Sequence, residues 1–587
     1  MELKELYRDE LSHLKLLAQD FVEEYPDLES FLSSSAADPD VERLLEGSAF
    51  LTARLRKKIE DGFPEITHGL LEEVWPTPLR PIPATTIVEF FPDDNGEMLV
   101  VPKGTHIKGI VDSKPDEYLF KVQREVEVLP LELVDRKMAH SNDGSQITLT
   151  FRWNGKSDEH EWQPSSFTLF LGKNHATAGL LQLWLSHYLK DVKIQSNDQT
   201  YTAPLDSVAL MKPDADTLAL PIEIKQYWRL QLLQEYFYTP HVNDFVHLDL
   251  SKAIRKLPLN DEGVFQVTFN FNRIFPFEYA IDEQVFKLHC VPAINLFNEL
   301  SSSIQFVTGK QSHTRYPLNP ANRDHRIFQI LSMYSPADAS DNNRGMIQEY
   351  RAITNFVPTR FTQEHDAYFY KLELENDVRE SPVHRVSFFD HEGKSVEITD
   401  RNYFICELEC DDGERVMCLN EGDICEPTSE VPSGLSFRNI TTLTKPQAPL
   451  PSSHRHWPLI SHLSLSPMFL NDKKAIQQVI LDFDIHMDAN RPANDKHRRY
   501  LAGIEQVSSM PIDRLFNGLP VRGLKMKLHL NPDFYPDLGE AYRFGSLLTQ
   551  FFAYCITDNS FLFTDIFNTQ TNECWTLPQI TGTRGQI

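Results

Sequence analysis

The chain has 587 residues and a formal net charge of −27 at pH 7, from 57 Lys and Arg against 84 Asp and Glu. Hydrophobic residues make up 41% and charged residues 24%, a composition that can fill cores and excludes wholesale disorder. Because neutralising phosphates needs a basic face, the acidic balance excludes sequence-independent nucleic-acid binding and disfavours an anionic membrane surface. At roughly 100–200 residues per domain, the length predicts several domains or one large multilobed body.

Targeting segments and disulfides are not expected. The N-terminus has no basic segment followed by an apolar core, and no window approaches ~18 consecutive apolar residues, so we expect neither a signal peptide nor direct membrane insertion. The cysteines number seven, which is odd and unlike a disulfide framework, so we expect a cytoplasmic protein.

Residues 1–83 predict a helical arm followed by a Pro-rich strap. Apolar residues at three- and four-residue steps predict an amphipathic helix that Pro26 ends. Asp38 as N-cap and Pro39 at the first helical position announce a second helix, and a third starts at Pro64. Residues 76–83 (PTPLRPIP) must form a stiff connector. Periodicity leaves open whether these helices fold back as a cap or project and bundle with a partner's helices.

From residue 84 onward the apolar period changes to two, which predicts short strands joined by turns. We expect a β-rich lobe with inserted helices over residues 84–300, a second β-rich lobe over 301–445 and a C-terminal α+β domain over 446–587. Inserted helices are predicted at 180–189 and 224–237, and a late one at 538–556. The predicted fold class is therefore α+β multidomain, with an N-terminal helical arm followed by several β-rich lobes with a few inserted helices.

Familiar catalytic motifs are absent from the sequence. It contains no phosphate-binding loop, no Gly-x-Gly-x-x-Gly turn, no Gly-x-Ser-x-Gly elbow and no His-Glu-x-x-His. These absences remove the most recognisable enzyme classes, although a site assembled from distant residues escapes such a search. We therefore expect no catalytic residues, no cofactor and no enzymatic activity.

The strongest metal candidate in the sequence is a group of four thiols, Cys406, Cys410, Cys418 and Cys425. Their intervals differ from the close pairs of a zinc knuckle, and residues 403–409 read as a strand, where two thiols four apart share a face. We interpret them as buried thiols that act as small apolar residues, and expect no metal.

A second candidate is the alternation of Asp482, Asp484, His486 and Asp488, which a strand would place on one face. The same alternation is typical of the polar face of a half-buried strand, and we favour that interpretation. His454 and His456 lie in a Pro-rich stretch that predicts an exposed loop.

Several segments form an ordered set of blocks. They are residues 7–11 (YRDEL) with 40–51 (DVERLLEGSAFL) and 79–83 (LRPIP), then 288–297 (LHCVPAINLF), 457–465 (WPLISHLSL), 544–554 (FGSLLTQFFAY) and 559–561 (NSF). Together these blocks resemble the TssF family (also called VasA or ImpG), a baseplate subunit of the bacterial type VI secretion system. They run through nearly the whole chain. Departures at 467–469 and 555–558 concern local packing near the C-terminus.

The resemblance implies a structural wedge protein without catalytic residues, sited at the inner face of the cell envelope through the baseplate. The implied partners are TssG, with two TssF copies per TssG, a second TssF copy, TssK, TssE, neighbouring wedges and the hub of tube and spike. It favours a projecting arm that bundles with partner helices. The expected buried contacts are Leu3, Tyr7, Leu14, Leu44, Leu51 and Leu55.

Two alternatives of other classes remain open at this point. A hydrolase on a β scaffold could use an unidentified carboxylate pair among the 84 acids, and a deep apolar-walled pocket would indicate it. A binding module stabilised by metal at Cys406–Cys425 would be recognised from its metal content.

Overall fold

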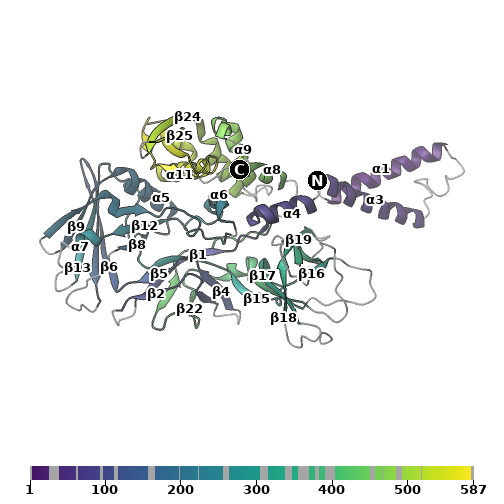
Figure 1. Ribbon diagram of the computed structural model, residues 1–587, viewed down its shortest axis with the longest axis horizontal. Helices are drawn as coiled ribbons and strands as arrows, with labels where there is room; N and C mark the ends of the chain where they lie inside the picture. Colours follow the sequence, from purple (N-terminus) through teal and green to yellow (C-terminus); the bar gives the residue numbers. More distant parts are fainter. Residues whose placement is uncertain are drawn as a thin grey trace.

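The computed structural model describes most of the chain. The described residues are 3–24, 39–60, 64–92, 97–111, 117–155, 166–196, 199–222, 224–254, 263–303, 315–336, 347–353, 369–376, 382–389, 404–449, 456–483 (except 464 and 466), 492–516 and 519–582. Helices and several β sheets occur together, so the protein is an α+β multidomain protein (Figure 1). No described helix has both the length and the apolar character needed to cross a bilayer.

The N-terminal region is helical. It comprises α1 (Leu3–Glu24), α3 (Pro39–Glu60), α4 (Pro64–Val74) and the short η2 (Thr77–Leu79). The prediction of helices here is confirmed. The predicted N-cap Asp38 lies outside the described residues.

The central sheet joins segments that are far apart in sequence. Its order is β22-β3-β4-β14-β1-β23, in which β1 is antiparallel to both β14 and β23. The strands are β1 (Thr85–Phe91), β3 (His106–Ile110), β4 (Glu117–Val122), β14 (Cys290–Ile294), β22 (Ile424–Pro427) and β23 (Ser436–Asn439), with β2 (Leu99–Val101) and β5 (Val126–Val128) paired beside them. Strands β3 and β4 alternate between buried and more exposed residues, whereas β14 in the middle of the sheet is buried along its whole length.

A second region lies at the end of the molecule opposite the arm (Figure 1). One sheet has the order β10-β9-β13-β7-β6, and a smaller one β11-β12-β8. The strands are β6 (Leu131–Ser141), β7 (Gly144–Trp153), β8 (Ser166–Phe170), β9 (Leu189–Ser196), β10 (Gln199–Ala203), β11 (Val208–Leu210), β12 (Phe245–Asp249) and β13 (Val264–Phe271). The helices are α5 (His175–Leu183), α6 (Trp228–Tyr238), α7 (Ser251–Ile254) and the short η3 (Trp184–Tyr188), η4 (Leu205–Ser207) and η5 (Lys225–Tyr227).

Both inserted helices were predicted, with shifted bounds. The first begins earlier than expected because Asn174 caps it, its side chain accepting from the backbone N–H of Ala176 and Thr177. It ends in a π turn, and the chain enters β9 at Leu189.

A third sheet, of order β15-β21-β17-β18-β19-β20-β16, makes up the lobe beneath the arm root. Its strands are β15 (Phe297–Leu300), β16 (Tyr316–Leu318), β17 (Arg326–Pro336), β18 (Ile347–Ala352), β19 (Phe369–Asn376), β20 (Pro382–Phe389) and β21 (Ile405–Asp411), and η7 (Gly413–Cys418) follows. Strand β21 confirms the strand predicted at residues 403–409.

The C-terminal region places helices on one side of a mixed sheet. Its elements are α8 (His456–His462), η9 (Pro467–Asn471), α9 (Lys473–Phe483), α10 (Pro492–Ala502), β24 (Ile504–Phe516), β25 (Leu519–Leu530), η10 (Pro532–Phe534), α11 (Leu538–Tyr554), β26 (Phe561–Asn568), β27 (Cys574–Thr576) and β28 (Ile580–Thr581). The late helix predicted at 538–556 is confirmed by α11.

Two sequence interpretations in this region are wrong. Asp482 belongs to helix α9 rather than to a strand, because the apolar side chains Ile476, Val479, Ile480 and Phe483 are buried at helical spacing. The remaining members of that alternation, residues 484–488, lie outside the described residues. His456 is not in an exposed loop: it begins α8 and is buried.

The largest apolar core is built from residues that are far apart in the sequence. It combines residues of the second region, among them Trp184 and Phe269, with residues of the C-terminal region such as Phe551 and Trp575. Smaller cores fill the central sheet and the sheet beneath the arm root. The described side chains of the arm helices α1 and α3 belong to none of these cores.

Candidate functional site: a projecting two-helix arm

Helices α1 and α3 pack against each other and project away from the β-rich body (Figure 1). The side chains of Leu6, Ala49 and Ala53 are fully buried. Alanine lets helix axes approach closely, so the two helices meet over a small apolar seam. Two partly exposed ion pairs join the helices, Lys15–Glu42 at 3.0 Å and Arg56–Glu10 at 2.9 Å. The arm is therefore held mainly by its narrow apolar core, because partly exposed ion pairs contribute little to stability.

A row of leucines on α3 faces solvent. Leu44, Leu51 and Leu55 are 73%, 65% and 60% exposed. Steps of seven and four residues place them on one side of the helix, and helical geometry puts Ala49 and Ala53 on the opposite side, toward α1. The row therefore points away from the arm's own seam, and a partner can reach it.

Other residues expected at this interface lie on α1. Tyr7 and Leu14 are half-buried, and the side chain of Leu3 lies outside the described residues. Leu16, which sequence reasoning did not select, is 61% exposed, and Leu17 and Phe21 are also exposed. Leu16 breaks the three-and-four pattern of α1, so periodicity gave no signal for it.

The arm root is anchored by α4. Trp75, at the end of α4, is buried with its ring centroid 5.4 Å from that of Phe483. The Thr67 hydroxyl lies 3.1 Å from His456 Nδ1 on α8. Burial, together with the charge of Arg80, lowers the pKa of His68 to about 4, so this imidazole is neutral at pH 7. The root is thus a packed joint with the C-terminal region and not a loose tether.

The four thiols of the sequence-based metal candidate occupy different environments. Cys406 and Cys410 point into the core of the sheet beneath the arm root, and burial raises the pKa of Cys406 to about 12. Cys418 contacts the Tyr118 hydroxyl, and Cys425 is exposed. They do not come together as one ligand set in the structure.

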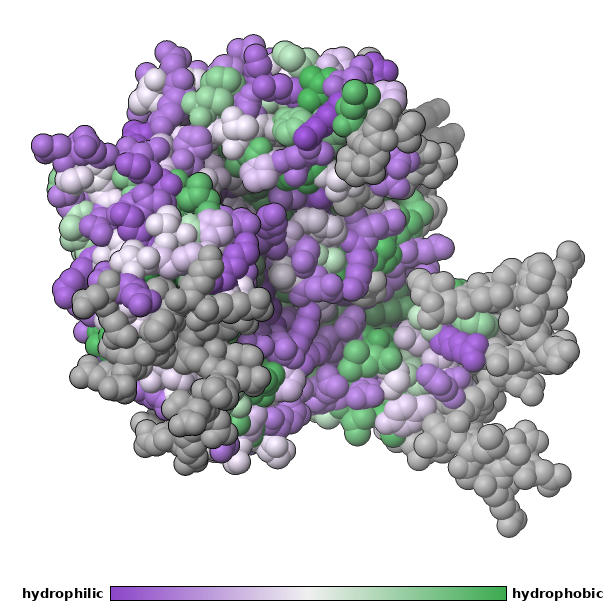
Figure 2. Space-filling model, turned by 60° about the vertical axis from the view of Figure 1, so that its left-hand side comes forward, coloured by the Kyte–Doolittle hydropathy of each residue, from purple (hydrophilic) through white to green (hydrophobic). Residues whose placement is uncertain are grey.

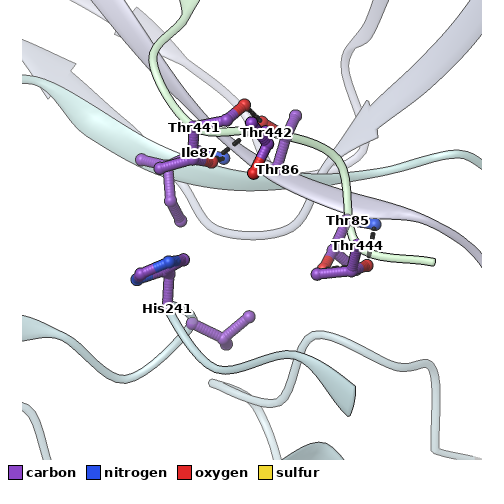
Figure 3. A pocket seen from close by; sticks show the side chains of 8 residues that line it. Thr85, Thr86, Ile87, His241, Thr441, Thr442 and Thr444 are labelled. Atoms are coloured by element: carbon purple, nitrogen blue, oxygen red, sulfur yellow. Dashed lines mark hydrogen bonds between the residues drawn. The ribbon is translucent and has the colours of Figure 1, made fainter. Parts of the chain in front are cut away.

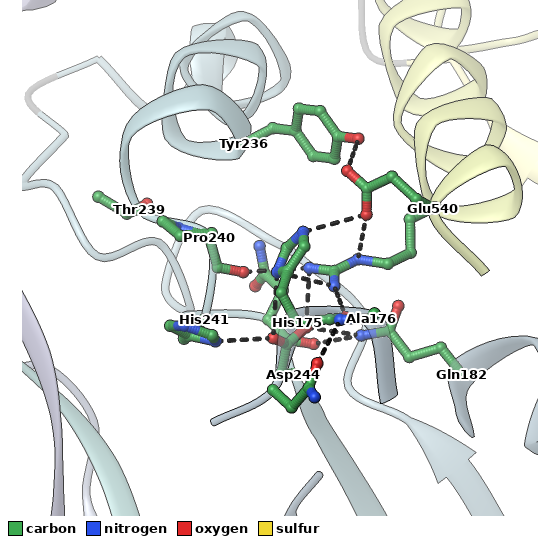
Figure 4. A network of polar contacts seen from close by, with 12 residues as sticks. His175, Ala176, Gln182, Tyr236, Thr239, Pro240, His241, Asp244 and Glu540 are labelled. Atoms are coloured by element: carbon green, nitrogen blue, oxygen red, sulfur yellow. Dashed lines mark hydrogen bonds and ion pairs between the residues drawn. The ribbon is translucent and has the colours of Figure 1, made fainter. Parts of the chain in front are cut away.

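A different group with metal-ligand chemistry, unseen in the sequence, joins α5 to α11. The side chains of His175, His241 and Asp244 converge (Figure 4). Arg543 Nη2 lies 2.8 Å from Asp244 Oδ1, and Gln182 donates to the same carboxylate at 3.0 Å. The guanidinium thus already supplies positive charge at this carboxylate.

The hydrogen bonds of this group assign its proton positions. Arg543 Nη1 lies 3.2 Å from His175 Nδ1, which must then accept, so Nε2 carries the hydrogen that faces Glu540 at 3.0 Å. Tyr236 donates to the other Glu540 oxygen at 2.6 Å. Burial raises the pKa of Glu540, but the hydrogen bond with His175 and the charge of Arg543 outweigh burial and lower this pKa to about 2. The cluster serves as an internal ion network that locks two helices together.

A small cavity lies next to this network. It is lined by His241 and by threonines of β1 and the segment after β23 (Figure 3). Thr85 and Thr444 bond each other at 3.1 Å, and Thr86 donates to the Thr441 carbonyl at 2.8 Å. Its lining contains no carboxylate, so it lacks the acid pair that the hydrolase alternative requires.

Figure 2 shows hydrophilic side chains interspersed with small hydrophobic groups over one face of the molecule.

Comparisons with known proteins bear on the whole chain. A family model described as "Type VI secretion system, TssF" matches residues 1–584. The type VI secretion system component TssF1 of Pseudomonas aeruginosa is 25% identical over 615 residues, covering 95% of this chain and 95% of that protein.

Two solved structures share the fold. One comes from the type VI secretion system TssK-TssF-TssG baseplate subcomplex, with a TM-score of 0.70 and 21% identity over 92% of this chain and 99% of that chain. The other comes from the baseplate complex of the type VI secretion system, with a TM-score of 0.60 and 18% identity over 98% of this chain and 99% of that chain.

Proposed function

Because this chain belongs to the TssF family of the type VI secretion system, we propose that it is a structural wedge of the baseplate that works by holding partner proteins together. The observation that carries this proposal is the projecting arm with its exposed row of Leu44, Leu51 and Leu55. In this role the protein is non-enzymatic and acts in the cytoplasm, at the inner face of the envelope.

The proposed partners follow from the family and from the relatives. A similar chain has been solved together with TssK and TssG, so we propose that this chain binds the TssG and TssK of its own system. A second copy of the chain, TssE, neighbouring wedges and the hub of tube and spike complete the assembly proposed from the family resemblance.

The arm supplies enough apolar surface to support a stable contact. Fully burying one leucine side chain is worth about 1.5–3 kcal/mol. Three leucines that are each at least 60% exposed can therefore contribute several kcal/mol when a partner helix covers them. Spacings of seven and four residues match a helix laid along α3, which supports a helical partner such as TssG.

The test is the double variant Leu44→Asp with Leu51→Asp, co-expressed with TssG. Two carboxylates in the apolar row must be desolvated on binding, so we expect co-purification with TssG to fall at least about tenfold. Both positions are exposed, so the circular dichroism and the thermal midpoint of the variant alone should match those of the wild type.

The matched control, Leu205→Asp with Val134→Asp, also introduces two Asp residues at exposed apolar positions, but away from the arm. In the wild type the side chains of Leu205 and Val134 are 50% and 41% exposed. This control should retain TssG. Undiminished co-purification of the Leu44/Leu51 variant would show that the row does not bind TssG.

A further inference from the structure

The C-terminal sheet is two-faced. On one face Val507, Met526, Leu528 and Ile566 are buried, and α11 lies against Ile566 through the space left by Gly545. Strand geometry sends the alternate residues to the opposite face. Among the described residues of that second face, Phe561 is buried, whereas the other apolar side chains of β24, β25 and β26 are exposed or half-buried.

The second face carries cations and aromatic rings in adjoining rows. Its accessible members are Met510, Ile512 and Arg514 on β24, Lys525, Lys527 and His529 on β25, and Phe563 and Phe567 on β26. All are exposed or half-buried, and Met510 is 43% exposed. The register sets Lys525 between Met510 and Phe563, and His529 stacks on Phe567 at 4.8 Å.

The charge of this face opposes that of the chain. Arg514, Lys525 and Lys527 are positive. Asp565 on β26 lies opposite Lys527 in the register and forms an ion pair with Lys525 at 2.8 Å. Arg514 lies over the Phe563 ring at 6.0 Å, bonded to the neutral Gln579 side chain. A locally positive, partly apolar face therefore stands on a molecule of net charge −27.

We propose that this open face, distinct from the arm, is a docking surface for an acidic protein segment that also carries apolar side chains. Carboxylates of that segment pair with Lys527 and Arg514, while its apolar side chains cover Met510, Ile512 and Phe563. A long nucleic acid fits less well, because a few cations do not offset the repulsion between a polyanion and a strongly acidic chain.

The test measures binding of the full-length protein to a short fluorescent peptide of alternating Glu and Leu, by fluorescence anisotropy. We expect the double variant Arg514→Glu with Lys527→Glu to bind at least about tenfold more weakly than the wild type. Raising NaCl from about 50 to about 500 mM should weaken wild-type binding and leave the variant little changed. The conservative change Lys527→Arg keeps the positive charge and should keep affinity within about threefold.

The control Lys190→Glu with Lys193→Glu makes the same change of net charge on exposed residues of β9 and should bind like the wild type. A peptide with Gln in place of Glu should bind about tenfold more weakly. Equal binding by wild type and the Arg514/Lys527 variant would overturn the proposal. So would tighter binding of an oligothymidylate than of the acidic peptide, because the face would then prefer nucleic acid.

Discussion

At the scale of single residues, Glu235 is a buried ionisable group with a strongly raised pKa. Its carboxylate is fully enclosed, and accepts the backbone N–H of Leu220 at 2.8 Å and of Ala219 at 3.2 Å. Burial raises the pKa of Glu235 to about 7, despite these hydrogen bonds and the nearby charge of Arg124. The folded protein therefore holds a proton here that the unfolded chain, with a pKa near 4.5, has lost by pH 6.

This carboxyl predicts a pH dependence of stability. Because its folded-state pKa is raised, Glu235 contributes to the free energy of unfolding an amount that is fully present below pH ~4.5. This contribution, up to about 3 kcal/mol, is lost as pH rises through 7. The variant Glu235→Gln keeps an acceptor for Leu220 but does not titrate. We expect the thermal midpoint of Glu235→Gln, relative to the wild type, to rise between pH 5 and pH 8.

The comparison of the two proteins cancels every other titrating group. A constant difference for Glu235→Gln would mean that this carboxyl is ionised throughout the range.

At the scale of elements, the crossing of α5 and α11 depends on two glycines. A Cβ added at Gly539 would lie 2.2 Å from the backbone carbon of Gly179, closer than any real contact. At Gly179 the nearest atoms would be Arg543 Cδ at 3.2 Å and the backbone carbon of Gly539 at 3.3 Å. The crossing therefore needs glycine at Gly539 more strictly than at Gly179, and it positions the Asp244–Arg543 network.

Three Gly→Ala variants in helices should form a graded series. Gly539→Ala should lose about 3 kcal/mol or more through overpacking of backbone on backbone, and Gly179→Ala about 1 kcal/mol. Gly47→Ala, on the open face of α3, meets nothing within 4 Å and should gain about 0.5–1 kcal/mol of helix stability. The thermal midpoint measures the stability of each variant, and the helicity by circular dichroism measures that of the arm for Gly47→Ala. A larger stability loss for Gly47→Ala than for Gly539→Ala would refute this account.

At the scale of the whole molecule, the arm and the body are stabilised separately. Where the side chains of α1 and α3 are described, they belong to none of the apolar cores, whereas the largest core takes residues from both ends of the body. Leu71 of α4 and Trp75, which follows α4, belong to that core, so the body begins at the arm root. The proposed C-terminal domain at 446–587 therefore shares its core with residues far upstream.

Two truncations test this organisation. Removing residues 1–60 should leave the thermal midpoint of the body within about 2 °C of that of the full chain, while abolishing TssG binding. Residues 446–587 expressed alone should expose core residues such as Phe551 and Trp575, bind a hydrophobic dye and unfold without a sharp transition. A cooperative unfolding transition of that fragment would show that it folds independently.

The sequence by itself determined the local periods. Apolar steps of three and four residues, with Pro39 and Pro64, sufficed for the arm helices, and alternation from residue 84 sufficed for the sheets, because both signals lie within single elements. The ordered family blocks identified the family. The position of Asp482 was misread because a short polar pattern fits a strand as well as a helix end.

Only the tertiary structure decided what those elements face. The exposure of Leu44, Leu51 and Leu55 depends on α1 packing against Ala49 and Ala53, which the period of α3 cannot reveal. Arg543 reaches His175 across 368 positions, and the open face of the C-terminal sheet exists because α11 covers the other side. Local pattern specifies the form of an element, whereas burial and charge pairing arise from contacts between elements that chain topology brings together.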